Sequence, residues 1–434
     1  MKSYLRQLIG LLILTAFGSG VLKTIQYHLS TSFQVNSHPE LTAQKPLFES
    51  DFASTKIHTE THAASLVELK DGRLRAFWFA GTREGARDVQ IHSAVFDPRN
   101  SKWSAEQVVA TRDDTEKSVL RYVSKLGNPV CGRASDGKLW LIYVTVSLGG
   151  WSGSSLTVKT SANEGKTWSA ARRIITSPFL NVSTLVKGAP FLYSDGTMGL
   201  PVYQELNNDF GEILRFDKDG HLIDKQRLST GTDDGLQPIV LVKNDNDAQV
   251  LMRNSGSKYS QQVISVSTKD GGQHWTSPIH LPLFNPNSAL SAVMLSHQRI
   301  LAVVNDQNRQ GISKGRDALS LMISADGGSS WKLIYRLEDQ LEARKDPLDA
   351  ASYYNSAKVL ASRSANGMMR SAVDAHAESA KSAMCKADNC GFEFSYPYLI
   401  QIKNGDFHLV YTWNRSFIKH VWFNQAWIGQ QLHQ

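Results

Sequence analysis

The sequence predicts an all-β protein, a six-bladed β-propeller with a short N-terminal segment and one helical insertion before the last blade. Two kinds of sequence repeat predict the propeller. Pairs of apolar strands joined by a tight turn recur six times, at intervals of about 50–65 residues apart from one double interval. A turn motif that ends in tryptophan recurs in phase with these pairs. A β-sandwich, the alternative fold, does not explain this even spacing.

The strand pairs are defined by their turns. Asp-Gly and Asn-Gly favour hairpins because both central residues take positive φ. Four pairs turn at Asp71-Gly72, Asp136-Gly137, Asp195-Gly196 and Asn404-Gly405, and two turn near Asn246 and His297. The double interval contains residues 338–391, which are rich in Ala, Ser and Lys and poor in strand formers. This composition predicts a mostly helical insertion.

The second repeat has the pattern S/T-x-D/N-x-G-x-x-W. It occurs as SANEGKTW at 161–168, TKDGGQHW at 268–275 and SADGGSSW at 324–331. The Asp or Asn accepts backbone N–H bonds, the Gly supplies positive φ, and the Trp packs the turn onto the sheet. We therefore interpret these residues as structural and assign them no catalysis.

Composition, net charge and the N-terminal segment limit the possible functions. The chain has 434 residues, 41% hydrophobic and 20% charged, which excludes disordered, collagen-like and polytopic membrane proteins. The net charge of +7 fits an anionic ligand, a membrane surface or simply a solvated basic surface. Residues 1–28, with Lys2 and Arg6 before an apolar stretch, predict a signal peptide or membrane anchor. A linker over 29–55 and the propeller over 56–434 follow, so we expect an exported protein of the periplasm or cell envelope.

In a propeller, the first strand of each blade lines the axis, so its polar residues should meet at one mouth of that axis. Counting back from each hairpin turn gives His62, Asn128, Lys187, Gln237, Ser288 and Tyr396. Charged residues near strand ends add Arg83, Glu84, Arg87, Asp88, Arg253 and Arg316. Arginines so placed suit bidentate binding of a carboxylate, although solvation or struts between blades also explain them.

These motifs resemble a known family. The repeated turns resemble the Asp-boxes, or BNR repeats, of sialidases (neuraminidases), and the resemblance covers roughly 57–428. The chain is also similar to bacterial sialidase-like proteins through four strings, at His62–Gly72, Trp78–Gly85, Ser395–Pro397 and Tyr411–Val421. The resemblance implies a propeller of sialidase type that acts on a glycan ending in an acidic sugar.

The resemblance also implies residue roles. Asp88 matches the acid/base, Tyr396 the nucleophile, and Arg83, Arg253 and Arg316 match arginines that bind substrate, with Asn128 in the family's GNP string. Two positions depart from the family. His62 stands where the first arginine of the carboxylate-binding triad belongs, and Gln237 where a glutamate activates the tyrosine. An unaided tyrosine, with a pKa of about 10, is a poor nucleophile, so His62 is a candidate base or carboxylate ligand.

Three functions therefore stay open. The first is an exported glycoside hydrolase that removes sialic acid or another carboxylated sugar from a glycan. The second is a polysaccharide lyase acting on uronic acids, in which His62 or Tyr396 takes the α-proton. The third is a non-catalytic propeller that binds acidic glycans. We expect a monomer with no cofactor and no nucleic-acid partner, and with membrane attachment only through the N-terminal segment.

The sequence gives no strong metal signature. His58 and His62 would share a face of one strand, but no third ligand is evident nearby, so no metal site is predicted. Cys385 and Cys390 either close a small loop or remain free thiols, and both readings stay open.

Overall fold

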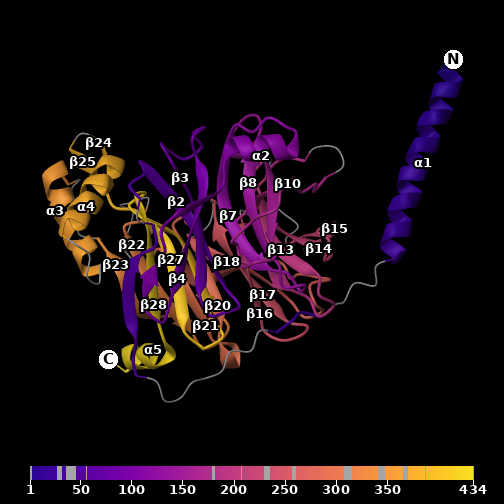
Figure 1. Cartoon of the computed structure of the whole chain (residues 1–434). Helices are drawn as coiled ribbons and strands as arrows, with labels where there is room; N and C mark the ends of the chain where they lie inside the picture. The colour runs from indigo at the N-terminus through magenta and orange to yellow at the C-terminus, as the bar shows by residue number, and fades with distance from the viewer. Residues whose placement is uncertain are drawn as a thin grey trace.

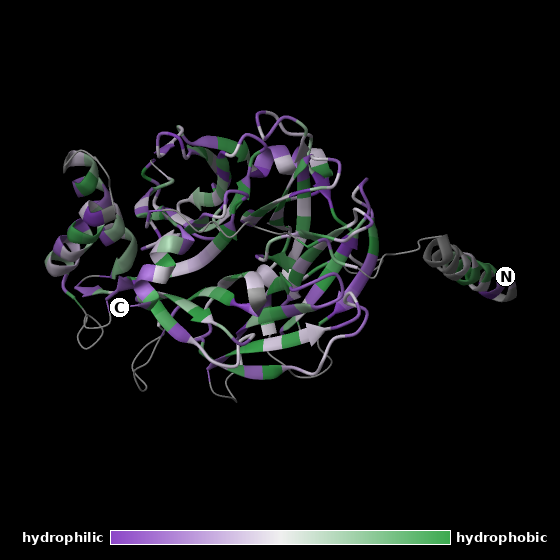
Figure 2. Ribbon diagram, turned by 90° about the horizontal axis from the view of Figure 1, so that it is seen from below, coloured by the Kyte–Doolittle hydropathy of each residue, from purple (hydrophilic) through white to green (hydrophobic). Residues whose placement is uncertain are grey.

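The protein is a six-bladed β-propeller. The computed structural model describes residues 2–26, 32–35, 45–54, 56–177, 181–206, 208–228, 235–256, 261–306, 315–340, 348–364, 370–386 and 388–433. Six antiparallel sheets of four or five strands are arranged around a common centre, seen from the side in Figure 1 and from below in Figure 2. The predicted fold class and the helical segment before the last blade are therefore confirmed.

The first three blades follow one another along the chain. Blade 1 consists of β2 (Glu60–Glu68), β3 (Leu74–Gly81), β4 (Gln90–Asp97), β5 (Lys102–Trp103) and β6 (Gln107–Ala110). Blade 2 consists of β7 (Lys125–Arg133), β8 (Leu139–Val146), β9 (Ser154–Ser161) and β10 (Arg172–Arg173). Blade 3 consists of β11 (Leu185–Val186), β12 (Phe191–Leu192), β13 (Met198–Gln204), β14 (Phe210–Phe216) and β15 (Leu222–Arg227).

The last three blades complete the ring. Blade 4 consists of β16 (Gly235–Val242), β17 (Ala248–Asn254), β18 (Gln262–Thr268) and β19 (Ile279–Phe284). Blade 5 consists of β20 (Ser291–Met294), β21 (Ile300–Val304), β22 (Ala318–Ser324) and β23 (Lys332–Asp339). Blade 6 consists of β26 (Phe394–Gln401), β27 (Phe407–Trp413), β28 (Phe417–Phe423) and β1 (Phe48–Phe52).

Blade 6 combines both ends of the chain. β1 pairs antiparallel with β28, with Phe48 opposite Phe423, and so supplies the outer strand of the last blade. Phe48 also stacks on Trp427 of α5 (Gln425–Leu432), with ring centroids 4.4 Å apart. The segment expected as a linker over 29–55 therefore contains a propeller strand, which ties the first blade to the last without a covalent bond.

The predicted hairpins and turn motifs are present. The turn glycines Gly72, Gly137, Gly196 and Gly405 all have positive φ, between 81° and 91°. In each Trp-ending motif, the first hydroxyl accepts the glycine N–H: Ser161 from Gly165 at 2.9 Å, Thr268 from Gly272 at 3.0 Å, and Ser324 from Gly328 at 2.7 Å. The Asn or Asp oxygen accepts the N–H four residues on: Asn163 from Thr167, Asp270 from His274, and Asp326 from Ser330. These residues thus brace turns between the outer strands.

The segment before the last blade is a helical pair. It contains α3 (Ala350–Ser364) and α4 (Arg370–Met384), followed by the short hairpin of β24 (Cys385–Lys386) and β25 (Asn389–Cys390). A disulfide bond joins Cys385 to Cys390 across this hairpin, which decides between the two readings of these cysteines. Buried alanines on both helices join the core cluster of blade 6, and the pair lies at the edge of the propeller in Figure 1.

Two further helices lie at the periphery. α1 (Lys2–Gln26) lies apart from the propeller in Figure 1, and α2 (Arg112–Val119) lies on blade 2. Short 3₁₀ turns cover Trp151–Gly153 and Ser296–Gln298. Within the described residues, no helix combines the length and apolar character needed to cross a membrane. Export and membrane attachment through residues 1–28 stay predictions.

Candidate active site

The inner strands share an irregularity at one end of the axis. β2, β7, β16 and β26 each carry a break in register, at His62/Ser65, Gly127/Val130, Leu236/Ile239 and Ser395/Tyr398. A residue at each break has positive φ: Ala63 (51°), Asn128 (31°), Gln237 (54°) and Tyr396 (53°). Bulges re-aim side chains, and left-handed backbone at bulky residues marks functional sites. Four predicted axial residues, His62, Asn128, Gln237 and Tyr396, therefore lie at equivalent bulges.

His62 and Tyr396 are in direct contact. Their ring centroids lie 4.5 Å apart in an edge-to-face arrangement, and His62 is only 1% exposed. Burial lowers the pKa of His62 to about 3, with Glu393 opposing that shift and Arg415 and Arg316 adding to it. His62 is therefore a neutral imidazole at pH 7, and its Nδ1 has no hydrogen-bond partner among the described residues.

Two predicted arginines are held side by side. Arg253 Nε donates to the Asn287 side-chain oxygen at 2.7 Å, and Arg316 Nη2 donates to the Asn287 carbonyl oxygen at 3.4 Å. The Arg316 guanidinium also lies over the Tyr396 ring, 6.0 Å from its centroid. Arg253, Arg316 and Tyr396, which are remote in sequence, thus converge on one mouth of the axis.

A third arginine at this mouth was missed by the sequence analysis. Arg415 lies just after β27, donates to Glu393 Oε2 at 2.8 Å and forms an ion pair with Glu60 at 2.7 Å. Glu393 also pairs with Arg316 at 3.3 Å. Burial by itself raises the pKa of Glu393, but the groups around it, His62 and then Arg415 and Arg316, lower the value to about 2. Since His62 is neutral at pH 7, the two arginines keep Glu393 ionised.

Gln237 and Asn128 meet at another missed residue, Tyr203. Both side-chain amides donate to the Tyr203 hydroxyl at 3.4 Å, and Gln237 Oε1 accepts from Arg253 at the same distance. Burial raises the pKa of Tyr203 well above its usual value, so this phenol stays protonated. The position of the family's glutamate is therefore filled by an amide that bridges Tyr203 and Arg253.

The loop between β3 and β4 carries two candidate acids, Asp88 and Glu84, whose surroundings differ. Asp88 is exposed, and the Thr82 hydroxyl and N–H hydrogen-bond its carboxylate, which lowers its pKa. Glu84 is 31% exposed, lies 3.7 Å from Arg415, and has its pKa raised by burial. Within the described residues, neither Asp88 nor the exposed Arg83 forms a hydrogen bond or ion pair with the other predicted site residues. Glu84 is thus the carboxyl of this loop that lies in the site.

Two of the polar residues predicted to meet at this mouth, Lys187 and Ser288, have other roles. Lys187 is buried, and its Nζ donates to the carbonyl oxygens of Leu290 at 2.7 Å and Pro397 at 2.5 Å. Burial lowers its pKa to about 7. Ser288 is fully buried, and its neighbour Asn287 is the exposed residue that holds the arginines. Lys187 therefore joins blades 3, 5 and 6 across the axis, and blade 5 contributes Asn287 in place of Ser288.

A cavity of about 520 Å³ lies at the other end of the axis. It is lined by the far ends of the inner strands, including Glu68, Arg133, Leu241, Met294 and Gln401. None of the predicted site residues lines it. We therefore place the candidate site at the mouth that holds His62 and Tyr396, because the ionisable groups gather there.

The propeller fold, its repeated Trp-ending turns and the charged mouth are the features by which the chain can be assigned to a family. The chain belongs to the BNR repeat-like domain family, whose model matches residues 72–409. No curated protein matches the chain.

Solved structures with a similar fold include sialidases. The Hadza microbial sialidase Hz136 is 15% identical with a TM-score of 0.58, over 84% of this chain and 65% of that one, so the chain spans less than two thirds of its length. The intramolecular trans-sialidase from Ruminococcus gnavus is 13% identical with a TM-score of 0.56, over 87% and 96% of the two chains. A Dyadobacter fermentans protein of unknown function is 12% identical with a TM-score of 0.59, over 87% and 97%. At these identities the likeness shows the fold alone.

Proposed function

We propose that the protein is a glycoside hydrolase that removes a terminal acidic sugar, sialic acid or another carboxylated residue, from a glycan. The observation that carries the proposal is the placement of Arg253 and Arg316 on the single residue Asn287, next to the Tyr396–His62 pair. Cations that bind a carboxylate and a nucleophile that attacks the same sugar have to lie together in this way.

Arg253 is the cation best suited to the substrate carboxylate. Its described hydrogen-bond partners are the amide oxygens of Asn287 and Gln237, which are neutral, and Glu205 interacts with its charge without a described hydrogen bond. Arg316 and Arg415 share Glu393, so they add less net charge. His62 is neutral and contributes a hydrogen bond at most, where the family's arginine contributes charge.

Tyr396 is the nucleophile of the proposed reaction. Its phenolic oxygen forms a bond to the anomeric carbon as the bond from that carbon to the leaving oxygen breaks. The phenolic proton passes to His62. Burial disfavours the imidazolium form of His62, and the charge of Glu393 offsets part of that penalty. Glu84 gives its proton to the leaving oxygen. Water then attacks the glycosyl-tyrosine, its proton goes to Glu84, and His62 returns a proton to Tyr396.

The assignment of the acid role to Glu84 replaces the earlier expectation for Asp88. A proton donor at neutral pH needs a raised pKa, which burial gives to Glu84. The hydrogen bonds from Thr82 favour the ionised form of Asp88.

Turnover by the full chain tests this proposal. Fluorogenic glycosides of sialic acid and of glucuronic acid are incubated with the protein, and the products are identified by mass spectrometry. We expect release of the free acidic sugar, and loss of release in Tyr396→Phe with binding retained. Absence of turnover on a panel of acid-capped oligosaccharides would contradict the proposal.

A non-catalytic glycan-binding propeller is the second candidate. The observation that favours it is Gln237, which leaves Tyr396 without the family's activating carboxylate. A binder retains the acidic glycan in calorimetry but converts none of it. A lyase is distinguished from both by an unsaturated product that absorbs ultraviolet light.

Action outside the cytoplasm belongs to the same proposal. The disulfide between Cys385 and Cys390 supports it, because such bonds persist in oxidising compartments. Reduction of this bond in protein isolated from the cell's envelope fraction would argue against it.

A further inference from the structure

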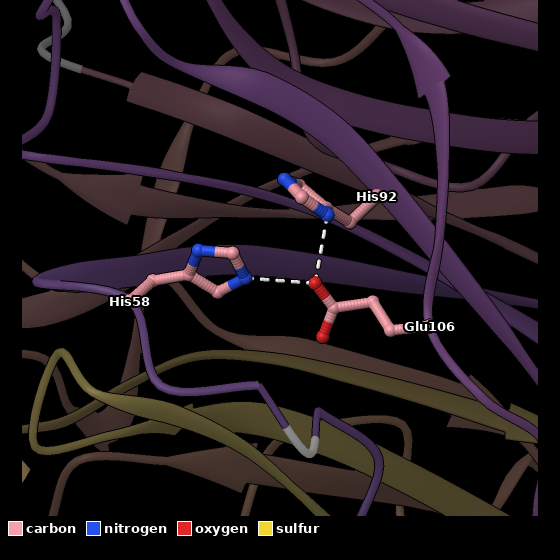
Figure 3. A group of neighbouring side chains, drawn as sticks. All are labelled: His58, His92 and Glu106. Atoms are coloured by element: carbon pink, nitrogen blue, oxygen red, sulfur yellow. Dashed lines mark hydrogen bonds and ion pairs between the residues drawn. The ribbon is translucent and has the colours of Figure 1, made fainter.

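A second cluster of ionisable side chains lies in blade 1, away from the contacts of the active-site mouth. It consists of His58, His92 and Glu106, shown in Figure 3. His58 Nε2 lies 2.8 Å from Glu106 Oε1, and His92 Nδ1 lies 2.7 Å from the same oxygen. One ligand atom from each residue lies within 4.8 Å of the others.

The three residues come from separate parts of the blade. His58 lies in the segment that leads into β2, His92 lies in β4, and Glu106 lies between β5 and β6. His62 is the histidine nearest to His58 in the sequence, but it contacts Tyr396. The other two members of the cluster, His92 and Glu106, lie 34 and 48 residues beyond His58 along the chain. This is why no ligand spacing was visible in the sequence.

The cluster is buried at its centre and open on one side. The side chain of Glu106 is 0% exposed and that of His92 is 3% exposed, whereas that of His58 is 19% exposed. The rings of His58 and His92 are 4.8 Å apart, and Trp78 stacks beside His92. An ion here would be shielded by the blade yet reachable by water from the His58 side.

Hydrogen bonding within the cluster leaves polar atoms unsatisfied. Both imidazoles approach Glu106 Oε1, while Glu106 Oε2 is buried with no hydrogen-bond partner among the described residues. His92 Nδ1 is close to Oε1 but lacks the alignment of a hydrogen bond. Buried polar atoms without partners are costly, and a shared cation would satisfy all of them.

We propose that His58, His92 and Glu106 bind one divalent transition-metal ion, with Zn²⁺ as the best match. Two imidazole nitrogens and one carboxylate are ligands that Zn²⁺ accepts, with a water molecule as the fourth. The ligand atoms are His58 Nε2, His92 Nδ1 and a Glu106 oxygen.

The role of the ion is structural. Ser54 binds the backbone of β28, and β2 begins at Glu60, so His58 lies on the short connection between blade 6 and blade 1. A metal at His58 fixes this connection to the outer part of blade 1. It thereby holds in place the strand that carries Glu60 and His62 into the active-site mouth.

Metal content of the full chain tests the proposal. The protein is stripped with a chelator, reloaded with Zn²⁺, dialysed, and measured by inductively coupled plasma mass spectrometry. We expect one zinc ion per chain, and at least about a tenfold loss of affinity in Glu106→Gln, which keeps the shape of the side chain but removes its charge.

Two further variants keep the test decisive. His58→Ala removes the partly exposed ligand and is expected to fold even if Glu106→Gln does not, and it should lose zinc to the same extent. His221→Ala alters an exposed Asp–His turn in blade 3 and should leave zinc binding unchanged. Cobalt loading adds a spectroscopic readout, since ligand-field absorption should be lost in His58→Ala and kept in His221→Ala. A wild-type chain that binds no zinc, or a His58→Ala chain that binds it as tightly as wild type, overturns the proposal.

Discussion

The charge of individual residues at the mouth depends on their surroundings as well as on their residue type. His62 occupies the bulge where an arginine is expected, yet burial keeps it neutral at pH 7. A positive guanidinium is supplied instead by Arg415, which pairs with Glu393 at 2.8 Å. The charge balance of the mouth is therefore set by residues from several blades.

The two acids of the β3–β4 loop should differ in their effect on catalysis. Glu84→Gln is expected to lower kcat about a hundredfold, because general acids contribute on this scale. Because Glu84 acts in its protonated form, activity should fall as pH rises through its raised pKa. Asp88→Asn is the matched control and should retain kcat and the pH profile. Loss of activity in Asp88→Asn alone would return the acid role to Asp88.

Arg253 should determine recognition of the carboxylate. Arg253→Ala is expected to raise KM between about tenfold and a hundredfold for an acidic glycoside, since charge-assisted hydrogen bonds are lost. The methyl ester of the same glycoside is the control, because it lacks the charge and should be bound equally by both enzymes. Equal increases in KM for the acid and the ester would mean that Arg253 only supports the local structure.

At the level of secondary-structure elements, the features that could be predicted from the sequence are those encoded by short stretches of the chain. Asp-Gly turns and Trp-ending motifs specify their hairpins through short-range φ preferences and hydrogen bonds, so six blades could be counted. β1 was placed in a linker because Phe48–Phe52 pairs only with β28, far along the chain. Its strand character depends on that tertiary contact.

Residues of the candidate site could be predicted from the sequence where they occupy repeated positions in the blades. His62, Asn128, Gln237 and Tyr396 were found because inner strands repeat, so equivalent positions meet at the axis. Ser288 was placed one residue away from Asn287 because the turn of its strand pair has no Asp-Gly or Asn-Gly to fix the count. Lys187 does lie at the axis, but its contacts to Leu290 and Pro397, which bury it there, are visible only in three dimensions. Glu393 and Arg415 lie outside the repeat, and their pairing is visible only in three dimensions.

The Trp-ending turns should contribute to stability and not to activity. Asn163 accepts the Thr167 N–H at 2.9 Å and donates to its hydroxyl at 2.8 Å, so Asn163→Ala should cost about 1–2 kcal/mol of unfolding free energy. Denaturant unfolding measures this, with kcat unchanged. Asn100→Ala, in the turn between β4 and β5 of blade 1, removes a single backbone contact and should cost less. A drop in kcat for Asn163→Ala at full folding would disagree with a structural role.

Stability of the whole propeller should depend on buried histidines. Burial lowers the pKa of His62 and His408 from a usual 6.5 to about 3, and it also lowers that of His420 well below its usual value. Because the unfolded chain binds more protons below pH 6.5, stability is complete above that pH. It is lost as pH falls toward 3, by about 1.4 kcal/mol per pH unit for each histidine.

Blade 6 and blade 1 meet at two of these histidines. His408 Nδ1 and His420 lie 2.9 Å apart, and Phe96 of blade 1 packs against both rings. Denaturant unfolding at pH 7 and pH 5 measures the acid sensitivity. The double variant His408→Leu, His420→Leu should reduce it by about half, because it removes two of the four described histidines whose pKa burial lowers, His376 being the fourth. An unchanged slope with pH would place the sensitivity in other groups.

The central claim is that blades remote in sequence assemble one catalytic mouth around Tyr396. Covalent trapping tests it most directly. The full chain is treated with a fluorinated glycosyl fluoride of an acidic sugar, and the labelled peptide is located by mass spectrometry. We expect one sugar per chain on the peptide that contains Tyr396, and none in Tyr396→Phe. Turnover of acidic glycosides with the label on another residue would contradict it.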